Sequence, residues 1–391
     1  MSIPSLYPLR GSAAGLVLPP AEAFFAQLAG GLPTGDATCL VITHLLPGQV
    51  SFLPALTQLS PVAAVLPKPK SINGVLLEQV RSVYRCDVLD RELFADPRWL
   101  LRYLEERAAG RSLALLDIGG YFAPALAEVC AAFSGRILGV VEDTENGLQR
   151  YLRLDTLPVP VYSVARSPLK EAEDCLAGEA IVFSTEAILR DLGEILPGRQ
   201  ACVIGFGKIG AGIARALHGR HVRVVVIDTD PVRQAQAIAL GYGRAATLTD
   251  ALQAADLVFC ATGNRALNAG NLLHLRDGAY VATVTSRDDE LDLAGAGPLL
   301  HREDVAAGVV RYRHAEGHFH LLNDGNAVNF LHSSAIGPSI HLVKAEIIAA
   351  LAHLMSEPHD PGLYEVSSQV RASIAAAWMD AFHTPAVTAN A

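Results

Sequence analysis

Three glycines in the middle of the chain have the spacing of a dinucleotide-binding turn. Gly205, Gly207 and Gly210 follow an apolar run that begins at Ala201, and a helical pattern starts directly behind them. The first glycine permits a tight turn, the second lets a pyrophosphate approach the backbone, and the third lets the helix pack against the strand. Free N–H groups at the helix N-terminus then face the phosphates. The residues predicted to line this site are Gly205, Gly207, Lys208, Ile209 and Gly210.

One acidic residue distinguishes between the two nicotinamide cofactors. A second apolar run, Val222 to Ile227, ends at Asp228, 23 residues after Gly205. A carboxylate at this position accepts hydrogen bonds from ribose hydroxyl groups and repels a 2′-phosphate. The sequence therefore predicts NAD, and not NADP, as the cofactor.

Several polar residues earlier in the chain could carry proton chemistry. Lys170 and Asp174 are separated by one helical turn, so their side chains can share a face and hydrogen-bond. His44 follows a β-branched run, and an imidazole titrates near neutral pH. Asp117 and Asp143 each stand at the end of an apolar run. Each also has an ordinary interpretation, as a surface ion pair, a structural histidine or a strand-end acid that faces solvent.

The elements that must position these residues alternate between apolar runs and helical segments. Strands are predicted at residues 39–43, 62–66, 113–117 and 137–141, with helices at 74–83 and 97–109. The stretch 157–168 contains three prolines and is expected to be irregular and to end this series. A helix at about 184–196 leads into a second series, with strands at 257–261 and 279–284 and helices at 340–355 and 366–382. This βαβ rhythm implies parallel sheets.

The order of the runs predicts an α/β protein with two doubly wound parallel-sheet domains. We expect residues 1–183 to form a substrate-binding domain, residues 184–338 an NAD-binding Rossmann domain, and residues 339–391 helices that cross back to the first domain. Ligands of such sheets bind at the carboxyl ends of the strands. The substrate is therefore expected to meet the nicotinamide between the two domains.

Composition excludes several classes of function. The net charge is −9 and no run of Lys or Arg occurs, which argues against a nucleic-acid surface. The first residues lack the basic segment and apolar core of a signal peptide, and no run of about 18 apolar residues is available to span a membrane. The six cysteines are scattered without a Cys-x-x-Cys pair, so we expect free thiols in the cytoplasm.

Three segments outside the glycine turn resemble the S-adenosylhomocysteine hydrolase family. Residues 139–147 (Gly-Val-Val-Glu-Asp-Thr-Glu-Asn-Gly) are similar to its Gly-Val-Thr-Glu-Glu-Thr-Thr-Thr-Gly segment. Residues 167–174 are similar to its Ser-Val-Thr-Lys-x-x-x-Asp segment. Residues 324–329 and 337–339 are similar to Glu-Gly-Arg-Leu-Val-Asn and Gly-His-Pro-Ser. The segments keep the family's order around the nucleotide motif, so the resemblance covers about residues 35 to 345.

The resemblance implies an unusual use of tightly bound NAD. In this family the cofactor oxidises the 3′-hydroxyl of an adenosine-like substrate, and the ketone acidifies the 4′ C–H. A base removes that proton, the 5′ substituent is eliminated, water adds, and the ketone is reduced again.

The resemblance also assigns roles to individual residues. Lys170 would take the 3′-hydroxyl proton with Asp174 orienting it, and His44 would act near the 5′ position. Asp143 would bind ribose hydroxyls. Cofactor contacts are implied for Thr144, Thr262, Gly263, Asn264 and Asn329.

Departures from the family pattern predict a different substrate. Where the family has Asp-Asp-Gly-Gly, this chain has Asp117 followed by Ile118, so Asp117 is the candidate replacement for the missing acid. A histidine that helps to hold adenine is absent before Pro338, and residues 46–48 lack the Thr-x-Glu that reads the adenine edge. A site that loses such polar groups changes its specificity.

Four interpretations follow. We expect a specialised enzyme that eliminates a 5′ substituent, for example water, from a related nucleoside. The alternatives are hydrolysis of S-adenosylhomocysteine itself, a plain NAD-dependent dehydrogenase, and a non-catalytic regulator that binds NAD or a nucleoside. In each case the expected partner is a small nucleoside, without metal, nucleic acid or membrane, and the expected assembly is a homodimer or homotetramer.

Overall fold

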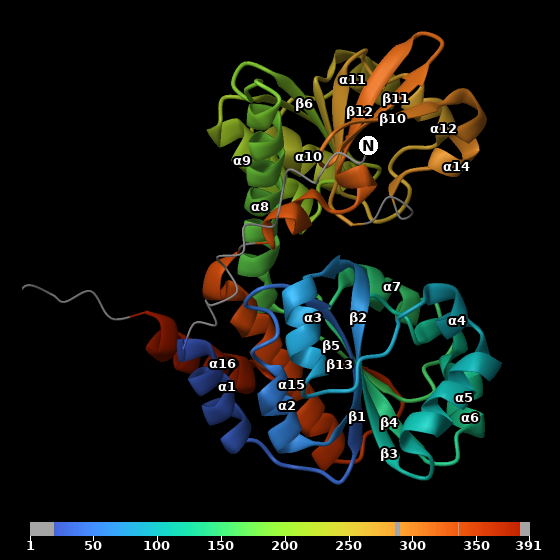
Figure 1. Cartoon of the computed structure of the whole chain (residues 1–391). Helices are drawn as coiled ribbons and strands as arrows, with labels where there is room; N and C mark the ends of the chain where they lie inside the picture. The colour runs from blue at the N-terminus through green and yellow to red at the C-terminus, as the bar shows by residue number, and fades with distance from the viewer. Residues whose placement is uncertain (1–18, 286–289, 335, 384–391) are drawn as a thin grey trace, which may run out of the picture. The chain divides into compact units, whose positions relative to one another are not determined.

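The computed structural model describes residues 19–285, 290–334 and 336–383, and it confirms the α/β class with parallel sheets (Figure 1). The chain divides into two compact units. Among the described residues, the central unit runs from Asp174 to Ile336, and the split unit combines residues 19–173 with the segment from Gly337. The division falls inside helix α8 (Glu171–Asp191). This helix was predicted at about 184–196, and α8 begins 13 residues before that range.

The split unit is built on a six-stranded sheet in the order β13-β5-β4-β3-β1-β2, and every pair is parallel. Its strands are β1 (Thr38–Leu45), β2 (Val62–Ile72), β3 (Ser112–Asp117), β4 (Arg136–Glu142), β5 (Pro160–Ser163) and β13 (Gly362–Tyr364). The four predicted strands are confirmed. The stretch 157–168 was expected to be irregular, and this is wrong for β5: Pro160 is its first residue, a position where a strand tolerates proline.

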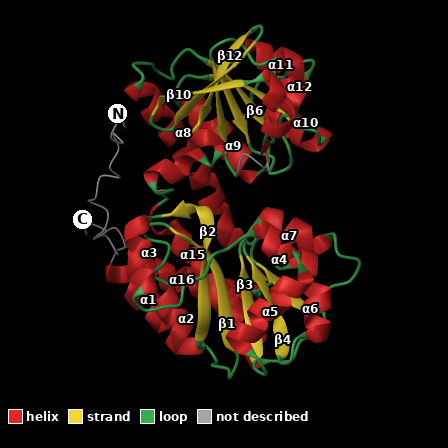
Figure 2. Ribbon diagram, turned by 45° about the vertical axis from the view of Figure 1, so that its right-hand side comes forward, coloured by secondary structure: helices red, strands yellow, loops and turns green. Residues whose placement is uncertain are grey.

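Helices cover both faces of this sheet (Figure 2). One apolar core packs α1, α2, α15 and α16 against one face, and another packs α4, α5 and α6 against the other. The helices are α1 (Pro19–Gly30), α2 (Leu53–Leu59), α3 (Gly74–Arg81), α4 (Arg91–Ala95), α5 (Pro97–Ala108), α6 (Leu126–Ala132), α7 (Glu145–Leu152), α15 (Ile340–Ser356) and α16 (Ser368–Phe382). The 3-10 turn η2 (Pro168–Lys170) leads into α8.

Helix α15, with the turn that precedes it, is the central helix of one core layer. The span Gly337–Ser356 is long and apolar enough to cross a membrane by length and composition, yet 78% of its apolar window is buried inside the protein. Lys344 and Glu346 lie within it and are buried as well. Burial of two charged side chains in an apolar helix requires partners, which are described below.

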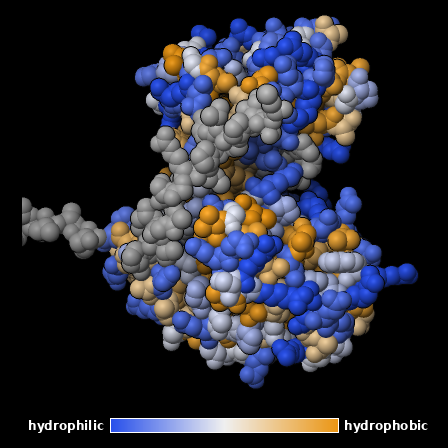
Figure 3. All heavy atoms as spheres, in the orientation of Figure 1, coloured by the Kyte–Doolittle hydropathy of each residue, from blue (hydrophilic) through white to orange (hydrophobic). Residues whose placement is uncertain are grey.

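Strand β2 forms one edge of the sheet and carries features that discourage further strand pairing. Pro67 and Pro69 lack N–H donors, and Lys68 and Lys70 place charges between and beside them. Apolar side chains are nevertheless visible on the surface of the split unit (Figure 3). The exposed apolar residues that follow in the chain include Ile72 and Val75.

The central unit is built on a seven-stranded sheet in the order β10-β11-β12-β9-β8-β6-β7. Its strands are β6 (Gln200–Ile204), β7 (Arg223–Ile227), β8 (Leu257–Cys260), β9 (Ala279–Thr283), β10 (His301–Ala306), β11 (Val309–His314) and β12 (Gly317–Leu322). Strands β7, β6, β8, β9 and β12 are parallel. Strands β10 to β12 form an antiparallel meander at one edge, so this sheet is mixed and not purely parallel as predicted.

The helices of the central unit pack closely on its sheet. They are α8, α9 (Lys208–Gly219), α10 (Pro231–Ala239), α11 (Leu248–Ala254), α12 (Ala269–Leu272) and α14 (Leu293–Ala296), with the turn η5 (Val328–His332) near the end. Helices α8 and α9 approach through Gly178 and Gly212, where a Cβ on Gly178 would lie 2.6 Å from the Gly212 carbonyl carbon. Glycine at both positions lets α8 lie against the helix that follows the predicted dinucleotide turn.

Candidate functional site

The turn between β6 and α9 has a geometry that only glycine can provide. Gly205 adopts φ +92°, and a Cβ on it would lie 2.7 Å from the carbonyl oxygen of Ala261. A Cβ on Gly210 would lie 1.9 Å from the carbonyl oxygen of Gly205. Both values are far below a van der Waals contact, so the first and third glycines of the motif allow the turn to close and α9 to pack on it.

The N-terminus of α9 is open on the side where a pyrophosphate would bind. Gly207 is the N-cap of α9, and no side chain of the described residues caps this helix. A Cβ on Gly207 would meet a single neighbour, Arg233 Nη1, at 3.1 Å. The first N–H groups of α9 are thus available to an anion, as a dinucleotide site requires. Lys208 forms an ion pair with Asp174 at 3.5 Å, and Ile209 packs against the apolar core.

Asp228 lies at the end of β7 with acceptor capacity left over. Its Oδ2 accepts a hydrogen bond from the N–H of Phe206 at 2.6 Å, and its Oδ1 accepts one from the N–H of Asp230 at 2.8 Å. A carboxylate offers about four lone-pair sites, so both oxygens can still accept ribose hydroxyls. The two backbone bonds fix the orientation of the side chain against the glycine turn.

The loop after β8 is held by a residue that the sequence did not indicate. Glu290 is fully buried and accepts hydrogen bonds from Gly263 N–H at 2.7 Å and from Thr262 Oγ1 at 2.7 Å. Burial raises the pKa of Glu290. Thr262 Oγ1 accepts from the N–H of the exposed Asn264 at 3.0 Å. Thr262 and Gly263 thus follow β8, and the Thr262 hydroxyl and the Gly263 N–H both donate to Glu290.

Asn329 offers an unused acceptor in the central unit. Its Nδ2 donates to Ser334 Oγ at 2.8 Å, and the side chain is only 6% exposed. Its Oδ1 is buried without a hydrogen-bond partner among the described residues. A buried acceptor without a partner is costly, and an N–H group of a bound cofactor would satisfy it. The residues of the central unit therefore fit the predicted dinucleotide.

In the split unit the predicted polar residues gather at one edge of the sheet. Strands β3 and β2 lie on opposite sides of β1, so the chain changes direction across the sheet at this point. Ligands of doubly wound sheets bind outside the carboxyl ends of the strands at such a switch point. His44 stands at the end of β1, Asp117 ends β3, and Asp143 directly follows β4.

His44 is held in its neutral form. Its Nδ1 lies 2.6 Å from Ser71 Oγ, and the Ser71 hydroxyl donates its proton to the carbonyl of Lys68 at 3.1 Å. The contact with Ser71 holds the imidazole ring in its orientation. Burial lowers the pKa of His44 well below 6.5, and the charges of Lys68, Lys344 and Lys170 lower the pKa further.

Asp143 combines one paired oxygen with one unpaired oxygen. The side chain is 10% exposed, and Oδ2 lies 3.5 Å from Lys344 Nζ. Oδ1 is buried and has no hydrogen-bond partner in the described part of the chain. Lys344 also lies 5.2 Å from the ring centroid of Phe52. Because Lys344 balances its charge, Asp143 can present Oδ1 as an acceptor at the carboxyl edge of the sheet.

Asp117, predicted as a catalytic acid, is engaged in holding a turn. It is fully buried and accepts from the N–H groups of Tyr121 and Phe122, both at 3.1 Å, and from Tyr151 Oη at 2.6 Å. Ile118, at the position of the second acid in the resembling family, is buried in the apolar core. This geometry gives Asp117 a structural function, because both of its oxygens accept hydrogen bonds that hold the loop after β3.

Glu142 and Thr144 form a second set of structural contacts beside Asp143. Glu142 is fully buried and accepts from the N–H groups of Gly119 and Gly120 at 3.0 and 2.9 Å. Thr144 donates its hydroxyl proton to Glu142 Oε1 at 2.6 Å and caps α7 by accepting from Gly147 N–H at 3.0 Å. Both residues bind the loop after β3 to the loop after β4.

Lys170 ends η2, and a chain of buried contacts positions it. Its Nζ forms an ion pair with Glu173. The N–H of Lys170 donates to the carbonyl of Ser167 at 3.0 Å, and the Ser167 hydroxyl donates to the buried carboxylate of Glu346 in α15. Arg371 of α16 donates to the same carboxylate at 2.7 Å. The C-terminal helices thus fix the turn that carries Lys170.

Lys68, Arg91 and Lys344 are charged residues of the split unit that sequence analysis missed. Lys344 could have been noticed, together with Glu346, as a charged residue within a mostly apolar helical run. Lys68 and Arg91 had no such signal, because a lysine between two prolines and an arginine after an aspartate usually face solvent.

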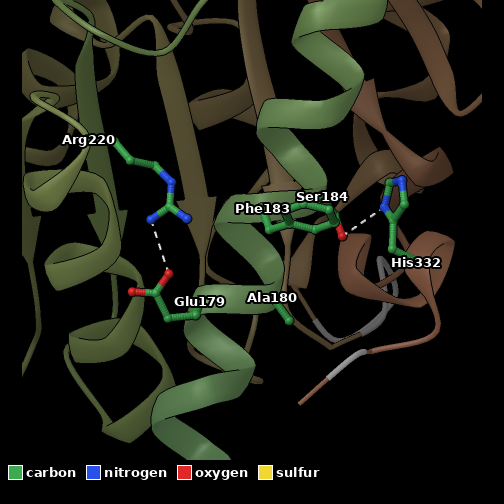
Figure 4. Close-up of a pocket in the computed structure, with 6 residues that line it drawn as sticks. All are labelled: Glu179, Ala180, Phe183, Ser184, Arg220 and His332. Atoms are coloured by element: carbon green, nitrogen blue, oxygen red, sulfur yellow. Dashed lines mark hydrogen bonds and ion pairs between the residues drawn. The ribbon is translucent and has the colours of Figure 1, made fainter. Parts of the chain in front are cut away.

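A small cavity of the central unit lies away from the glycine turn. It has a volume of about 140 Å³ and is lined by Glu179, Ala180, Phe183, Ser184, Arg220 and His332 (Figure 4). Arg220 follows the last residue of α9, whereas the glycine turn precedes its first residue, so the helix separates them by roughly 18 Å. Ser184 is fully buried, and its hydroxyl lies 3.0 Å from His332 Nδ1. This contact ties the turn that carries Asn329 to α8.

Comparison with known proteins supports the identity of the central unit. Residues 182–335 match the family model of the S-adenosyl-L-homocysteine hydrolase NAD binding domain. The match covers less than half of the chain. Together with the geometry of the glycine turn, it shows an NAD-binding Rossmann domain.

Solved structures show similarity at low identity. A dipicolinate synthase chain from Bacillus halodurans is 12% identical over 82% of this chain and 100% of that chain, with a TM-score of 0.45. An NADPH-dependent glyoxylate/hydroxypyruvate reductase from Sinorhizobium meliloti is 15% identical over 84% and 97%, with a TM-score of 0.41. D-lactate dehydrogenase from Escherichia coli is 17% identical over 67% and 78%, with a TM-score of 0.38. Scores at this level carry no inference about activity.

Proposed function

We propose that this protein is an NAD-dependent dehydrogenase that acts on a hydroxyl group of a nucleoside-like small molecule. The observation that carries the proposal is Asp143, whose buried Oδ1 has no partner in the described chain. It lies at the carboxyl edge of the sheet of the split unit, and its ion-pair partner Lys344 also acts on the neutral His44. A hydroxyl group of the substrate is the donor that such an oxygen requires.

Each polar residue of this edge has a separate role in the proposed reaction. Asp143 Oδ1 accepts a hydroxyl of the substrate and orients the sugar-like part. Lys170 Nζ, held by Glu173, exchanges the proton of the reacting hydroxyl. His44 is unprotonated, which is the state that a proton acceptor requires. The bound cofactor supplies the hydride acceptor, and the central unit holds it with Gly205, Gly207, Gly210, Asp228 and Asn329.

The plain dehydrogenase is preferred to the elimination chemistry of the resembling family because one acid is absent. Elimination needs a base for the 4′ proton, and that position is Ile118, while the neighbouring Asp117 is consumed by Tyr121, Phe122 and Tyr151. Elimination of a 5′ substituent from a nucleoside is the second candidate. The neutral His44 favours it, because an unprotonated imidazole can act as the missing base.

Product analysis tests the two candidates directly. The purified protein is incubated with NAD and either adenosine or S-adenosylhomocysteine, and NADH absorbance and products are followed together. The dehydrogenase predicts NADH in proportion to a ketone product. Elimination predicts loss of the 5′ substituent without net NADH. If neither substrate is converted while NAD binds normally, the assignment to nucleoside-like substrates is wrong.

A matched pair of variants tests the site. Asp143→Asn replaces the acceptor oxygen pair by an amide, and Asp155→Asn makes the same change at an exposed position of the same unit. We expect at least a tenfold loss of kcat/KM for the first variant, since a hydrogen bond to a charged group is worth about 1.5–3 kcal/mol, and no change for the second. Equal activity of both variants would remove Asp143 from the site.

The assembly is part of the same proposal. We expect a homodimer or homotetramer, and light scattering coupled to size-exclusion chromatography measures it.

A further inference from the structure

Two cations of the split unit converge on one glycine of the substrate-binding edge. A Cβ on Gly119 would lie 3.3 Å from Lys68 Nζ and 3.6 Å from Arg91 Nη2. Gly119 follows β3 and adopts φ +110°, and the ring of Tyr121 lies at the same position, with Cε2 3.5 Å from the Cβ point. The two nitrogens are less than about 7 Å apart, a distance that one carboxylate or phosphate group can bridge.

Neither cation is in direct contact with a carboxylate of the described residues. Within the described residues, Lys68 and Arg91 form no ion pair with any carboxylate. Arg91 donates through Nη1 to the carbonyl of Gly119 at 3.2 Å, and its guanidinium lies 4.0 Å from the ring centroid of Tyr121. These contacts hold the guanidinium in place without balancing its charge, and Nη2 remains directed at the position beside Gly119.

The acids that surround Lys68 each have another ion-pair or hydrogen-bond partner. The charges of Asp143, Glu142 and Asp117 act on Lys68 and raise its pKa, whereas burial, the larger effect, and Arg91 lower it. Asp143 pairs with Lys344, and Asp117 accepts from two backbone N–H groups and Tyr151. Glu142 accepts from the N–H groups of Gly119 and Gly120. The charges of these acids act on Lys68 from beyond ion-pair distance, but within the described residues none of them accepts a hydrogen bond from Lys68 Nζ or Arg91 Nη2. These two nitrogens therefore keep donors that an oxyanion of a bound molecule can accept.

We propose that Lys68 and Arg91 bind an oxyanion of the substrate, either a carboxylate or a phosphate group. The inference rests on the proposed function, because the anion belongs to the same molecule whose hydroxyl is oxidised. An oxyanion beside Gly119 would accept from Lys68 Nζ and from Arg91 Nη2, while a hydroxyl of the same molecule reaches Asp143 Oδ1. The substrate class is thus an anionic nucleoside or a similar anionic hydroxy compound.

Binding of matched neutral and anionic probes tests this site. The full-length protein, saturated with NAD, is titrated calorimetrically with adenosine, adenosine 5′-monophosphate and adenosine 5′-carboxylate at constant ionic strength. We expect at least one anionic probe to bind about tenfold more tightly than adenosine, or better, because charge-assisted hydrogen bonds are the stronger ones. The better of the two anionic probes distinguishes phosphate from carboxylate.

Variants identify the residues responsible. Lys68→Gln and Arg91→Gln should each remove most of the preference for the anion, and Lys68→Arg should keep it. Lys70→Gln and Arg98→Gln remove charges at exposed positions nearby and serve as controls, in which the preference should persist. Circular dichroism confirms that each variant is folded.

The result that overturns the inference is equally defined. Equal affinity of the wild type for neutral and anionic probes, including no binding of any probe, contradicts it. A preference that survives in both Lys68→Gln and Arg91→Gln contradicts it as well. Failure of the proposed function has a different signature: anion preference that depends on Lys68 and Arg91, with no NADH formed from any probe.

Discussion

Substitution of Gly210 by alanine tests the link between the glycine turn and cofactor binding. Gly210 lies in the first turn of α9, and the added Cβ would lie 1.9 Å from the carbonyl oxygen of Gly205. That oxygen belongs to the backbone of the turn and cannot rotate away. Either α9 or the turn must therefore move by about 1 Å or more to restore a normal contact.

The size of the effect follows from this displacement. Overpacking of a fitted interior costs about 1–3 kcal/mol, so the free energy of unfolding should fall by that amount. The same movement shifts the first N–H groups of α9 relative to the pyrophosphate. Loss of one or two charge-assisted hydrogen bonds corresponds to an affinity for NAD that is about tenfold to several hundredfold weaker.

Gly219→Ala provides the control in the same helix. Gly219 is the last residue of α9, and a Cβ there would meet nothing within 4 Å. Alanine is a better helix former than glycine, so this variant should be unchanged or more stable by up to about 1 kcal/mol, with unaltered NAD affinity.

Urea unfolding and calorimetric titration with NAD measure both quantities for the two variants. The reasoning is refuted if Gly210→Ala binds NAD as tightly as the wild type, or if both variants unfold at the same urea concentration. A loss of stability without a loss of affinity would show that the turn relaxes without moving the N-terminus of α9.

Three further predictions concern charged groups. Lys344→Met removes the ion-pair partner of the buried Asp143 and should lower the free energy of unfolding by about 3–5 kcal/mol. Adding Asp143→Asn to this variant should restore part of the loss. Urea unfolding measures both variants, and additive losses would contradict the pairing. Asp228→Ala should weaken NAD binding about tenfold and reduce the preference for NAD over NADP, as measured by calorimetry; an unchanged ratio would mean that another group excludes the 2′-phosphate. NMR titration should show that His44 stays neutral well below pH 6.5. The free energy of unfolding should therefore decrease as the pH falls from 6.5 towards the folded pKa of His44. Lys68→Gln should raise that pKa, and a His44 titration near pH 6.5 would contradict the burial described.

Much of the central unit could be predicted because its signals are local. The glycine turn depends on positive φ and on contacts between residues only a few positions apart, so the spacing of Gly205, Gly207 and Gly210 already contains the geometry. The strands β1, β3 and β4 were predictable for a similar reason, since a buried parallel strand is a continuous apolar run. In the edge meander, β10 carries charged, exposed residues, and β11 and β12 mix buried apolar residues with arginines and histidines, so none of the three is a continuous apolar run.

The roles of the acids could not be predicted, because burial and hydrogen bonding are set by partners far apart in the chain. Asp117 looked like a catalytic acid, and only its bond to Tyr151, 34 residues away, shows its commitment to the turn. Glu290 likewise reaches back 28 residues to Thr262. The sequence position of a carboxylate does not show how many hydrogen-bond donors will surround it in the fold.

The sequence by itself determined the cofactor and its domain, because the residues of a dinucleotide turn all lie within one βαβ unit and are close together in the chain. The tertiary structure decided which side chains face the substrate. Lys68 from β2 and Arg91 from α4 meet at Gly119 after β3, and Lys344 from α15 reaches Asp143 after β4. The parallel sheet brings the ends of these strands to one edge, and the charge balance of that edge depends on distances that no local pattern contains.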